Sequence, residues 1–120
     1  MPNNPLTLAY LGDAVYELYI RQYLISQGRL KPGDLQKASI NYVSAKSQCS
    51  YLEKLIQANF LTTEEIAITK WGRNAHGGKA KSTDIVTYRQ ATGLETLIGK
   101  LYLTNNINRI EEIIDFIVGN

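Results

Sequence analysis

Two acidic residues, Asp13 and Glu95, lie in segments whose other residues are mostly small, apolar or aromatic. Gly12 precedes Asp13, and Gly93 and Gly99 lie on either side of Glu95. Glycine in a helix costs roughly 1 kcal/mol relative to alanine, so its presence indicates that another helix approaches closely at that point. If the two segments cross there, the two carboxylates would share one pocket.

A pocket with two carboxylates is suited to a divalent cation. Burying an acid against apolar side chains is costly unless it is paired, hydrogen-bonded or bound to a metal, and Mg²⁺ and Mn²⁺ prefer carboxylate oxygens as ligands. One helical turn from the two acids lie Glu17 and Thr92, which are candidates for outer contacts to such a site. The alternative is that both acids are exposed or salt-bridged, as most helical acids are, and that Glu17 is a surface residue.

The remaining ionisable residues narrow the chemistry further. The chain has one cysteine and one histidine, Cys49 and His76, which excludes a zinc site built from these residue types. The formal net charge of +2 says little about partners, but basic residues gather in one segment. Between residues 70 and 89 a single acid, Asp84, accompanies five cations: Lys70, Arg73, Lys79, Lys81 and Arg89. Such a segment is either a phosphate-binding surface or an ordinary solvated loop.

The first element that must position these residues reads as a helix over residues 6–25. Its apolar residues recur at helical spacing, and we expect its buried stripe to contain Leu11, Ala14, Val15, Leu18 and Ile25. Because Asp13 lies within this helix, the acid is held on a regular element rather than on a loop.

Four further helical regions follow. Residues 35–59 begin after a good N-cap, Asp34, and we expect a break near Asn41, where helix preference weakens. A capping box formed by Thr62 and Glu65 begins a short helix that fades at Gly72. Residues 74–83 read as an exposed loop with two adjacent glycines, and residues 85–103 and 107–118 are helical.

The composition supports one small helical domain. A length of 120 residues and a hydrophobic fraction of 44% fit a single core, so we expect one domain over residues 1–120. Since no convincing strand pattern is present, the predicted fold class is all-α, with about five to six helices. No apolar run approaches the roughly 18 residues of a membrane span, and no secretory signal pattern is present. We therefore expect no membrane partner and a cytosolic location.

Five motifs of the chain resemble those of the ribonuclease III family. Residues 10–15, YLGDAV, resemble the signature helix of this family, and residues 94–103, LETLIGKLYL, resemble its second acidic helix. Supporting matches are residues 43–48, VSAKSQ, residues 72–75, GRNA, and residues 83–89, TDIVTYR. The resemblance covers about residues 6–104 and indicates the Mini-ribonuclease III branch, a catalytic domain that lacks a double-stranded-RNA-binding domain.

This resemblance implies a bundle like the ribonuclease III endonuclease domain and the hydrolysis of double-stranded RNA to 5′-phosphate and 3′-hydroxyl ends. Asp13 and Glu95 would be the catalytic residues and would hold Mg²⁺, or alternatively Mn²⁺, which would activate water and stabilise the developing phosphorane charge. Two acids usual in the larger family are replaced by Ala9 and Thr92, and only Asp34 roughly matches a third. The other ligands of the metal therefore stay open.

The resemblance also implies partners. It implies a homodimer, which we expect to form through residues 8–19, with two sites that cut opposite strands. The branch is associated with the maturation of large-subunit (23S) ribosomal RNA precursor, and hence with ribosome biogenesis in the bacterial cytoplasm or the plastid. Whether a ribosomal protein assists is not indicated by the sequence.

Duplex RNA is recognised by shape, 2′-hydroxyls and phosphates, and a domain without a separate binding module must make these contacts itself. The segment of residues 72–83 is the candidate, because Arg73, Lys79 and Lys81 lie close together without an acid. The full set of candidate RNA-binding residues is Arg73, Asn74, His76, Lys79, Lys81 and Arg89. If this segment is only a solvated loop, the duplex would be held elsewhere, for instance along Lys37 and Lys46.

Two other classes of function stay open on sequence grounds. The loss of two acids usual in the larger family favours a non-catalytic helical module that binds RNA or assists ribosome assembly. The eight tyrosines would also suit a helical adaptor that binds another protein. Cleavage of duplex RNA in the presence of Mg²⁺ separates the enzyme from both.

Overall fold

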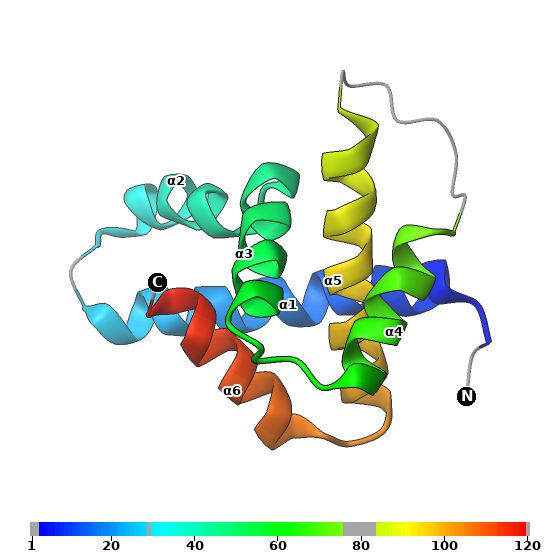
Figure 1. Cartoon of the computed structure of the whole chain (residues 1–120). Helices are drawn as coiled ribbons and strands as arrows, with labels where there is room; N and C mark the ends of the chain where they lie inside the picture. The colour runs from blue at the N-terminus through cyan, green and yellow to red at the C-terminus, as the bar shows by residue number, and fades with distance from the viewer. Residues whose placement is uncertain (1–2, 29, 76–83, 120) are drawn as a thin grey trace.

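The computed structural model describes residues 3–28, 30–75 and 84–119. Over these residues it contains six helices and no strand (Figure 1), so the predicted all-α class is confirmed. The helices are α1 (Pro5–Gln27), α2 (Pro32–Val43), α3 (Ala45–Gln57), α4 (Thr63–Arg73), α5 (Ile85–Leu103) and α6 (Ile107–Val118).

Helix α5 is the centre of the bundle. Helices α1, α3 and α4 all pack against it, and α1 crosses it below its midpoint in the view of Figure 1. Almost every residue from Ala91 to Leu101 is buried, whereas the first turns of α5 extend beyond the other helices. An acid in the buried part of α5 must therefore face a neighbouring helix.

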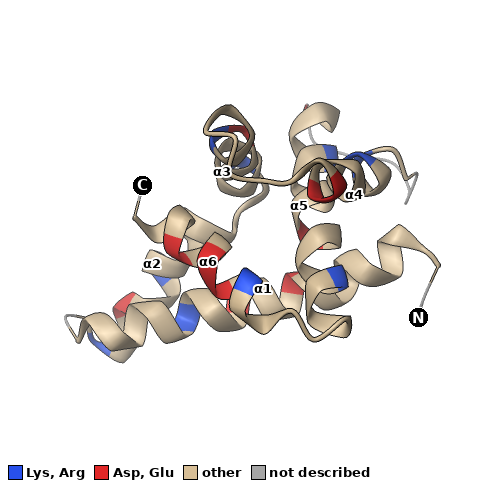
Figure 2. Cartoon of the chain, turned by 60° about the horizontal axis from the view of Figure 1, so that its bottom comes forward, with Lys and Arg blue, Asp and Glu red and all other residues tan. Residues whose placement is uncertain are grey.

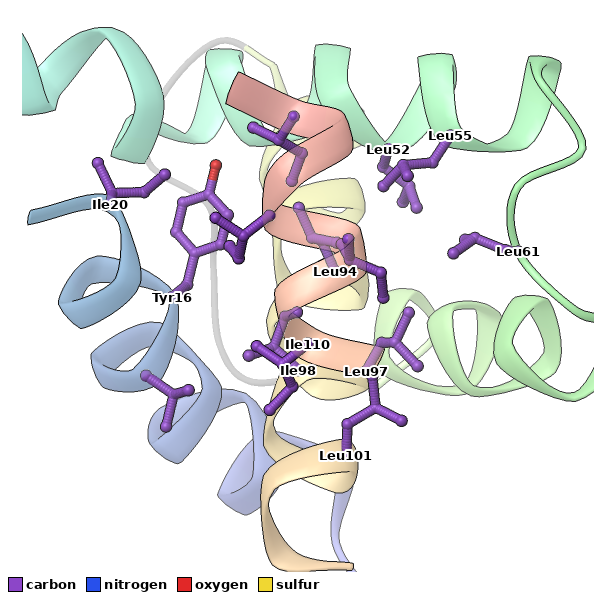
Figure 3. Packing of buried hydrophobic residues seen from close by; sticks show 14 of the residues in the cluster. Tyr16, Ile20, Leu52, Leu55, Leu61, Leu94, Leu97, Ile98, Leu101 and Ile110 are labelled. Carbon is purple, nitrogen blue, oxygen red and sulfur yellow. The ribbon is translucent and has the colours of Figure 1, made fainter. Parts of the chain in front are cut away.

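The core lies where α1, α3, α5 and α6 meet (Figure 3). Tyr16 and Ile20 of α1, Leu52 of α3, Leu97 of α5 and Ile110 of α6 are all fully buried there. Removing a leucine or isoleucine side chain from water contributes about 1.5–3 kcal/mol. These contacts hold the helices that carry Asp13 and Glu95 in a fixed relation.

The buried stripe of α1 differs from the predicted one. Of the predicted residues, Val15 is buried and Leu11 is half-buried, whereas Ala14, Leu18 and Ile25 are exposed. The residues that face the core follow a spacing of four: Leu8, Gly12, Tyr16, Ile20 and Leu24. A glycine stands at the closest approach, and since it carries no hydrophobic side chain, the apolar pattern alone was a poor guide to the buried face.

The break between the second and third helices also differs from prediction. It lies at Ser44 and not near Asn41, because the Ser44 hydroxyl accepts a hydrogen bond from the Ser47 backbone at 3.2 Å and begins a new helix. Helix α2 begins at Pro32, with Lys31 as its N-cap, so Asp34 lies in the first turn and does not cap it. Proline suits a first helical turn because it has no amide hydrogen to leave unpaired.

The remaining predicted boundaries agree with the structure to within two residues. The capping box of α4 is present, with Thr62 N–H donating to Glu65 at 2.9 Å and Glu65 N–H donating to Thr62 at 3.0 Å. Most of the loop predicted over residues 74–83 lies outside the described residues. In the part of the chain that the structure describes, none of the helices has both the length and the apolar character needed to cross a membrane.

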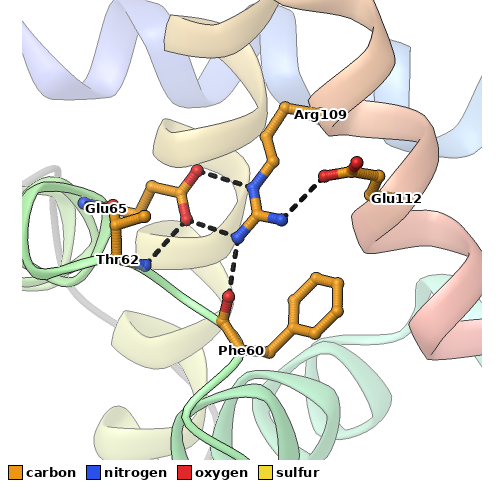
Figure 4. A network of polar contacts seen from close by, with 5 residues as sticks. All are labelled: Phe60, Thr62, Glu65, Arg109 and Glu112. Atoms are coloured by element: carbon orange, nitrogen blue, oxygen red, sulfur yellow. Dashed lines mark hydrogen bonds and ion pairs between the residues drawn. The ribbon is translucent and has the colours of Figure 1, made fainter.

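A network of charged side chains fastens α6 to α4 (Figure 4). The Arg109 guanidinium donates to both carboxylate oxygens of Glu65 at 2.8 Å, to the Phe60 carbonyl at 2.6 Å and to Glu112 at 2.9 Å. The hydrogen bonds from Arg109 hold the pKa of Glu65 below its ordinary value, although burial opposes this. Glu65 therefore stays ionised and joins two helices.

Candidate active site

The site begins at the crossing of α1 and α5. A Cβ atom added to Gly12 would collide with the backbone carbonyl of Glu95, and one added to Gly99 would collide with the carbonyl of Leu8. The two helix backbones therefore touch directly, which only glycine permits at these positions. This confirms that the glycines mark a close helix crossing, and it brings the residues beside them together.

The crossing places the side chains of Asp13 and Glu95 against each other. Asp13 is exposed, which differs from the expectation that both acids face apolar packing, and Glu95 is half-buried. Burial first, and then the charge of Asp13 and a hydrogen bond to it, raise the pKa of Glu95 to about 8. Glu95 in this arrangement resists ionisation unless a positive charge joins the pair.

The third residue at the pair is Gln48 of α3, to which the sequence assigned no role. Its side-chain amide donates to the Glu95 carboxylate at 3.3 Å and to the Val43 carbonyl at 3.0 Å. Gln48 is 1% exposed, and its Oε1 atom has no hydrogen-bond partner among the described residues. Its position on the buried stripe of α3, one turn before Leu52 and two before Leu55, is the signal that could have identified it.

The two candidates for outer contacts make their hydrogen bonds elsewhere. Glu17 pairs with Arg21 one turn along α1. Thr92 is buried, and its hydroxyl donates to the Tyr88 carbonyl of its own helix at 3.1 Å. The described contacts therefore place Gln48, rather than Glu17 or Thr92, beside the carboxylate pair.

Of the candidate RNA-binding residues, Arg73, Asn74 and Arg89 lie within the described part of the chain. Helices α4 and α5 meet at Gly72 and Gly93, and Arg73 follows at the end of α4. Gly93 is two residues from Glu95 and thus lies on a nearly opposite face of α5. Arg73 is half-buried and Asn74 exposed, with a hydrogen bond of 3.5 Å between their side chains.

Helix α4 ends in basic residues, whereas acids are prominent on α6 (Figure 2). Arg89 is half-buried in the second turn of α5. The other candidates, His76, Lys79 and Lys81, lie outside the described residues.

The donor set at Asp13 and Glu95 fits a hard divalent cation. Both donors are carboxylates, and their mutual repulsion is what a bound cation would offset. Among the described residues no group of three or more histidine, cysteine or acidic side chains gathers around one point. A cation here would therefore keep several water or phosphate ligands, as Mg²⁺ commonly does.

The fold and its motifs match known proteins. A family model described as the ribonuclease III domain matches residues 6–106. Mini-ribonuclease 3 of Enterococcus faecalis is 47% identical over 116 residues, which cover 96% of this chain and 88% of that protein. Mini-ribonuclease 3 of Brevibacillus brevis is 49% identical over 112 residues, which cover 92% and 82% respectively.

A solved structure has the same fold. The crystal structure of a protein from Fusobacterium nucleatum is similar with a TM-score of 0.86 and 34% sequence identity, and the match covers 98% of this chain and 94% of that chain. The chain therefore belongs to the ribonuclease III family of endoribonucleases, within its Mini-ribonuclease 3 branch.

Proposed function

We propose that the chain is a divalent-metal-dependent endoribonuclease that cleaves double-stranded RNA, with Asp13 and Glu95 as the catalytic residues. The observation that supports this most directly is the contact between the two carboxylates across the glycine crossing of α1 and α5. An arrangement that raises the free energy of the ionised pair is typical of a functional site.

In this proposal the two acids have different tasks. Half-buried Glu95 would be a fixed ligand for Mg²⁺ or Mn²⁺, and exposed Asp13 would be a ligand on the solvent side. When bound, the metal lowers the pKa of water and stabilises negative charge on the phosphate that is attacked. We propose 5′-phosphate and 3′-hydroxyl ends, as the family resemblance implies.

For the RNA we propose contacts along the end of α4 and the segment that follows. Lys70 and Arg73 form the basic last turn of α4, and Lys79 and Lys81 continue the basic segment in the sequence. Phosphate contacts by such cations position a duplex without reading its sequence. Asn74, His76 and Arg89 complete the proposed RNA-binding set.

For the assembly we propose a homodimer in which α1 packs against its copy. Tyr10 is 84% exposed, Leu18 51% and Ile25 65%, and with Ala14 they form an apolar stripe on the outer face of α1. The stripe borders a surface groove that contains Asp13. Two copies joined there would bring two carboxylate pairs near one duplex, so that each cuts one strand. The proposed substrate is ribosomal RNA precursor in the bacterial cytoplasm.

Cleavage of labelled duplex RNA tests the proposal. Purified chain is incubated with the duplex with and without Mg²⁺, beside Asp13→Asn, Glu95→Gln and, as a matched control on α6, Glu111→Gln. We expect Mg²⁺-dependent cleavage by the wild type and Glu111→Gln, and loss of more than about 100-fold in the other two, which exceeds the loss typical of an outer-shell partner. Near-wild-type cleavage by folded Asp13→Asn or Glu95→Gln would refute the two-acid site.

A second function keeps one observation in its favour. Since only two acids meet in the described part of the chain, and Ala9 and Thr92 occupy positions where the larger family usually carries acids, a non-catalytic RNA-binding module is the alternative. In the same assay it would bind the duplex without cutting it at any Mg²⁺ or Mn²⁺ concentration.

A further inference from the structure

The side-chain amide of Gln48 has only one orientation that satisfies its neighbours. Its two N–H groups point at two acceptors, the Val43 carbonyl and the Glu95 carboxylate. Turning the amide over would place Oε1 against the Val43 carbonyl and leave that carbonyl without its donor. The position of Val43 therefore fixes which end of the amide faces Glu95.

The anchor of this amide is itself held in place. Val43 is the last residue of α2, where backbone carbonyls lack partners within the helix. The neighbouring carbonyl, that of Tyr42, accepts a hydrogen bond of 2.8 Å from the hydroxyl of Tyr16 on α1. Since Tyr16 lies one turn after Asp13, the junction that orients Gln48 is tied to the helix that carries the other acid.

Gln48 makes hydrogen bonds through its amide nitrogen, whereas its Oε1 atom has no partner among the described residues. Gln48 is 1% exposed, and an apolar side chain of similar size would fill the same space without a buried acceptor that lacks a partner. The part of the side chain that does find partners is the donor end, and one of these partners is Glu95.

We propose that Gln48 is a positioning residue, which holds the Glu95 carboxylate toward Asp13 so that the two acids present a preformed divalent-cation site. The inference rests on the proposed function, because it assumes that Asp13 and Glu95 are the metal ligands. Hydrogen bonds of this kind orient a ligating carboxylate, and losing them typically weakens metal affinity 10–100-fold.

The test measures Mn²⁺ binding to the full chain without RNA, by electron paramagnetic resonance of free Mn²⁺. The variants are Gln48→Met, which keeps the volume and removes both donors, and Thr69→Val as a control. Thr69 is 3% exposed and donates to Ile66 within α4, away from the carboxylates. We expect Mn²⁺ affinity to fall at least about 10-fold in Gln48→Met and to stay unchanged in Thr69→Val.

Single-turnover cleavage gives a second reading. For Gln48→Met we expect a higher Mg²⁺ concentration at half-maximal rate, a rate at saturating Mg²⁺ near that of the wild type, and unchanged affinity for duplex RNA in the absence of metal. If Gln48→Met does not fold, Gln48→Asn is measured in the same way, since its shorter amide cannot reach both acceptors.

The measurements distinguish the metal site at Asp13 and Glu95 from the positioning role of Gln48. If the wild type and Asp13→Asn bind Mn²⁺ equally, the proposed metal site fails, and the role of Gln48 fails with it. If Asp13→Asn weakens Mn²⁺ binding while folded Gln48→Met or Gln48→Asn binds as the wild type does, only the role of Gln48 is overturned. Equal weakening in Thr69→Val would show a general loss of packing and would also overturn it.

Discussion

Glu65 and Glu95 lie on two helices that pack against each other, and each is largely withdrawn from solvent, yet their surroundings are opposite. Glu65 faces the Arg109 guanidinium, whose hydrogen bonds lower its pKa (Figure 4). Glu95 faces Asp13, and burial together with this second acid raises its pKa to about 8. One glutamate has its counter-charge within the chain and holds two helices together. The other has none among its described contacts and is suited to take one from outside.

The largest effect on stability is expected at the crossing of α1 and α5, which brings Glu95 to Asp13. In Gly12→Ala the new Cβ collides with the Glu95 backbone, so α1 and α5 must separate. We expect a loss of about 3 kcal/mol in the free energy of unfolding, measured with urea, together with loss of cleavage. Gly33→Ala is the matched control, because nothing lies within 4 Å of its added Cβ. Wild-type stability in Gly12→Ala would mean that the helices do not touch there.

The second largest effect is expected for Glu65→Ala, in the network that joins α4 and α6. This change removes the ion pair with Arg109 and half of the capping box of α4. A fully buried pair would cost more, but Arg109 is partly exposed, so we expect a loss of about 2 kcal/mol in the free energy of unfolding. Folded Glu65→Ala should keep its affinity for Mn²⁺, because the network is separate from the carboxylate pair. A large drop in that affinity would contradict the separation.

Unlike the two changes above, Glu95→Gln is expected to raise the free energy of unfolding of the metal-free protein. The pKa of Glu95 is raised in the folded state, to about 8 from an ordinary value of 4.5, so the stability of the wild type falls as pH rises from about 4.5 and levels off above about 8. A glutamine has no such slope. With solvent screening through exposed Asp13, we expect Glu95→Gln to be more stable by about 1 kcal/mol at pH 9 in EDTA. A less stable variant at that pH would show that the pair does not repel.

The smallest expected effect is the loss of the stability contribution of Glu65 as the pH falls. Its pKa is lowered in the folded state, so its contribution is complete above the ordinary value of 4.5 and is lost as pH falls through the folded value. Glu65→Gln keeps a residue suited to the capping box and removes the charge. Thermal unfolding should show the wild type ahead by about 0.5 kcal/mol at pH 6 and level with the variant in strong acid. A constant gap across this range would exclude the charge as its cause.

Local signals in the sequence predicted much of the fold and the helix crossing at which the candidate site lies. The capping box at Thr62 involves residues close together in the chain, and it was predicted correctly. The glycines beside Asp13 and Glu95 correctly predicted the helix crossing. The break at Ser44 was predicted near Asn41, because the residues around Asn41 weaken helix preference, whereas the Ser44 side chain caps the next helix. The contacts of Gln48 with Glu95 and of Arg109 with Glu65 join residues 44 or more positions apart, and no signal near Gln48 or Arg109 in the sequence identifies these partners.

The crossing of Gly12 and Gly99 also sets an order of events during synthesis. Asp13 leaves the ribosome before its partner acid, Glu95, which lies in a helix much later in the chain. Until α5 has emerged, the buried face of α1 has only α2 among its main packing partners, since α1 makes most of its contacts with α5. Contacts between residues so distant in sequence form late and slow the folding of a domain. A growing chain therefore holds Asp13 without its partner acid until α5 has been made, and only then can the pair of acids assemble.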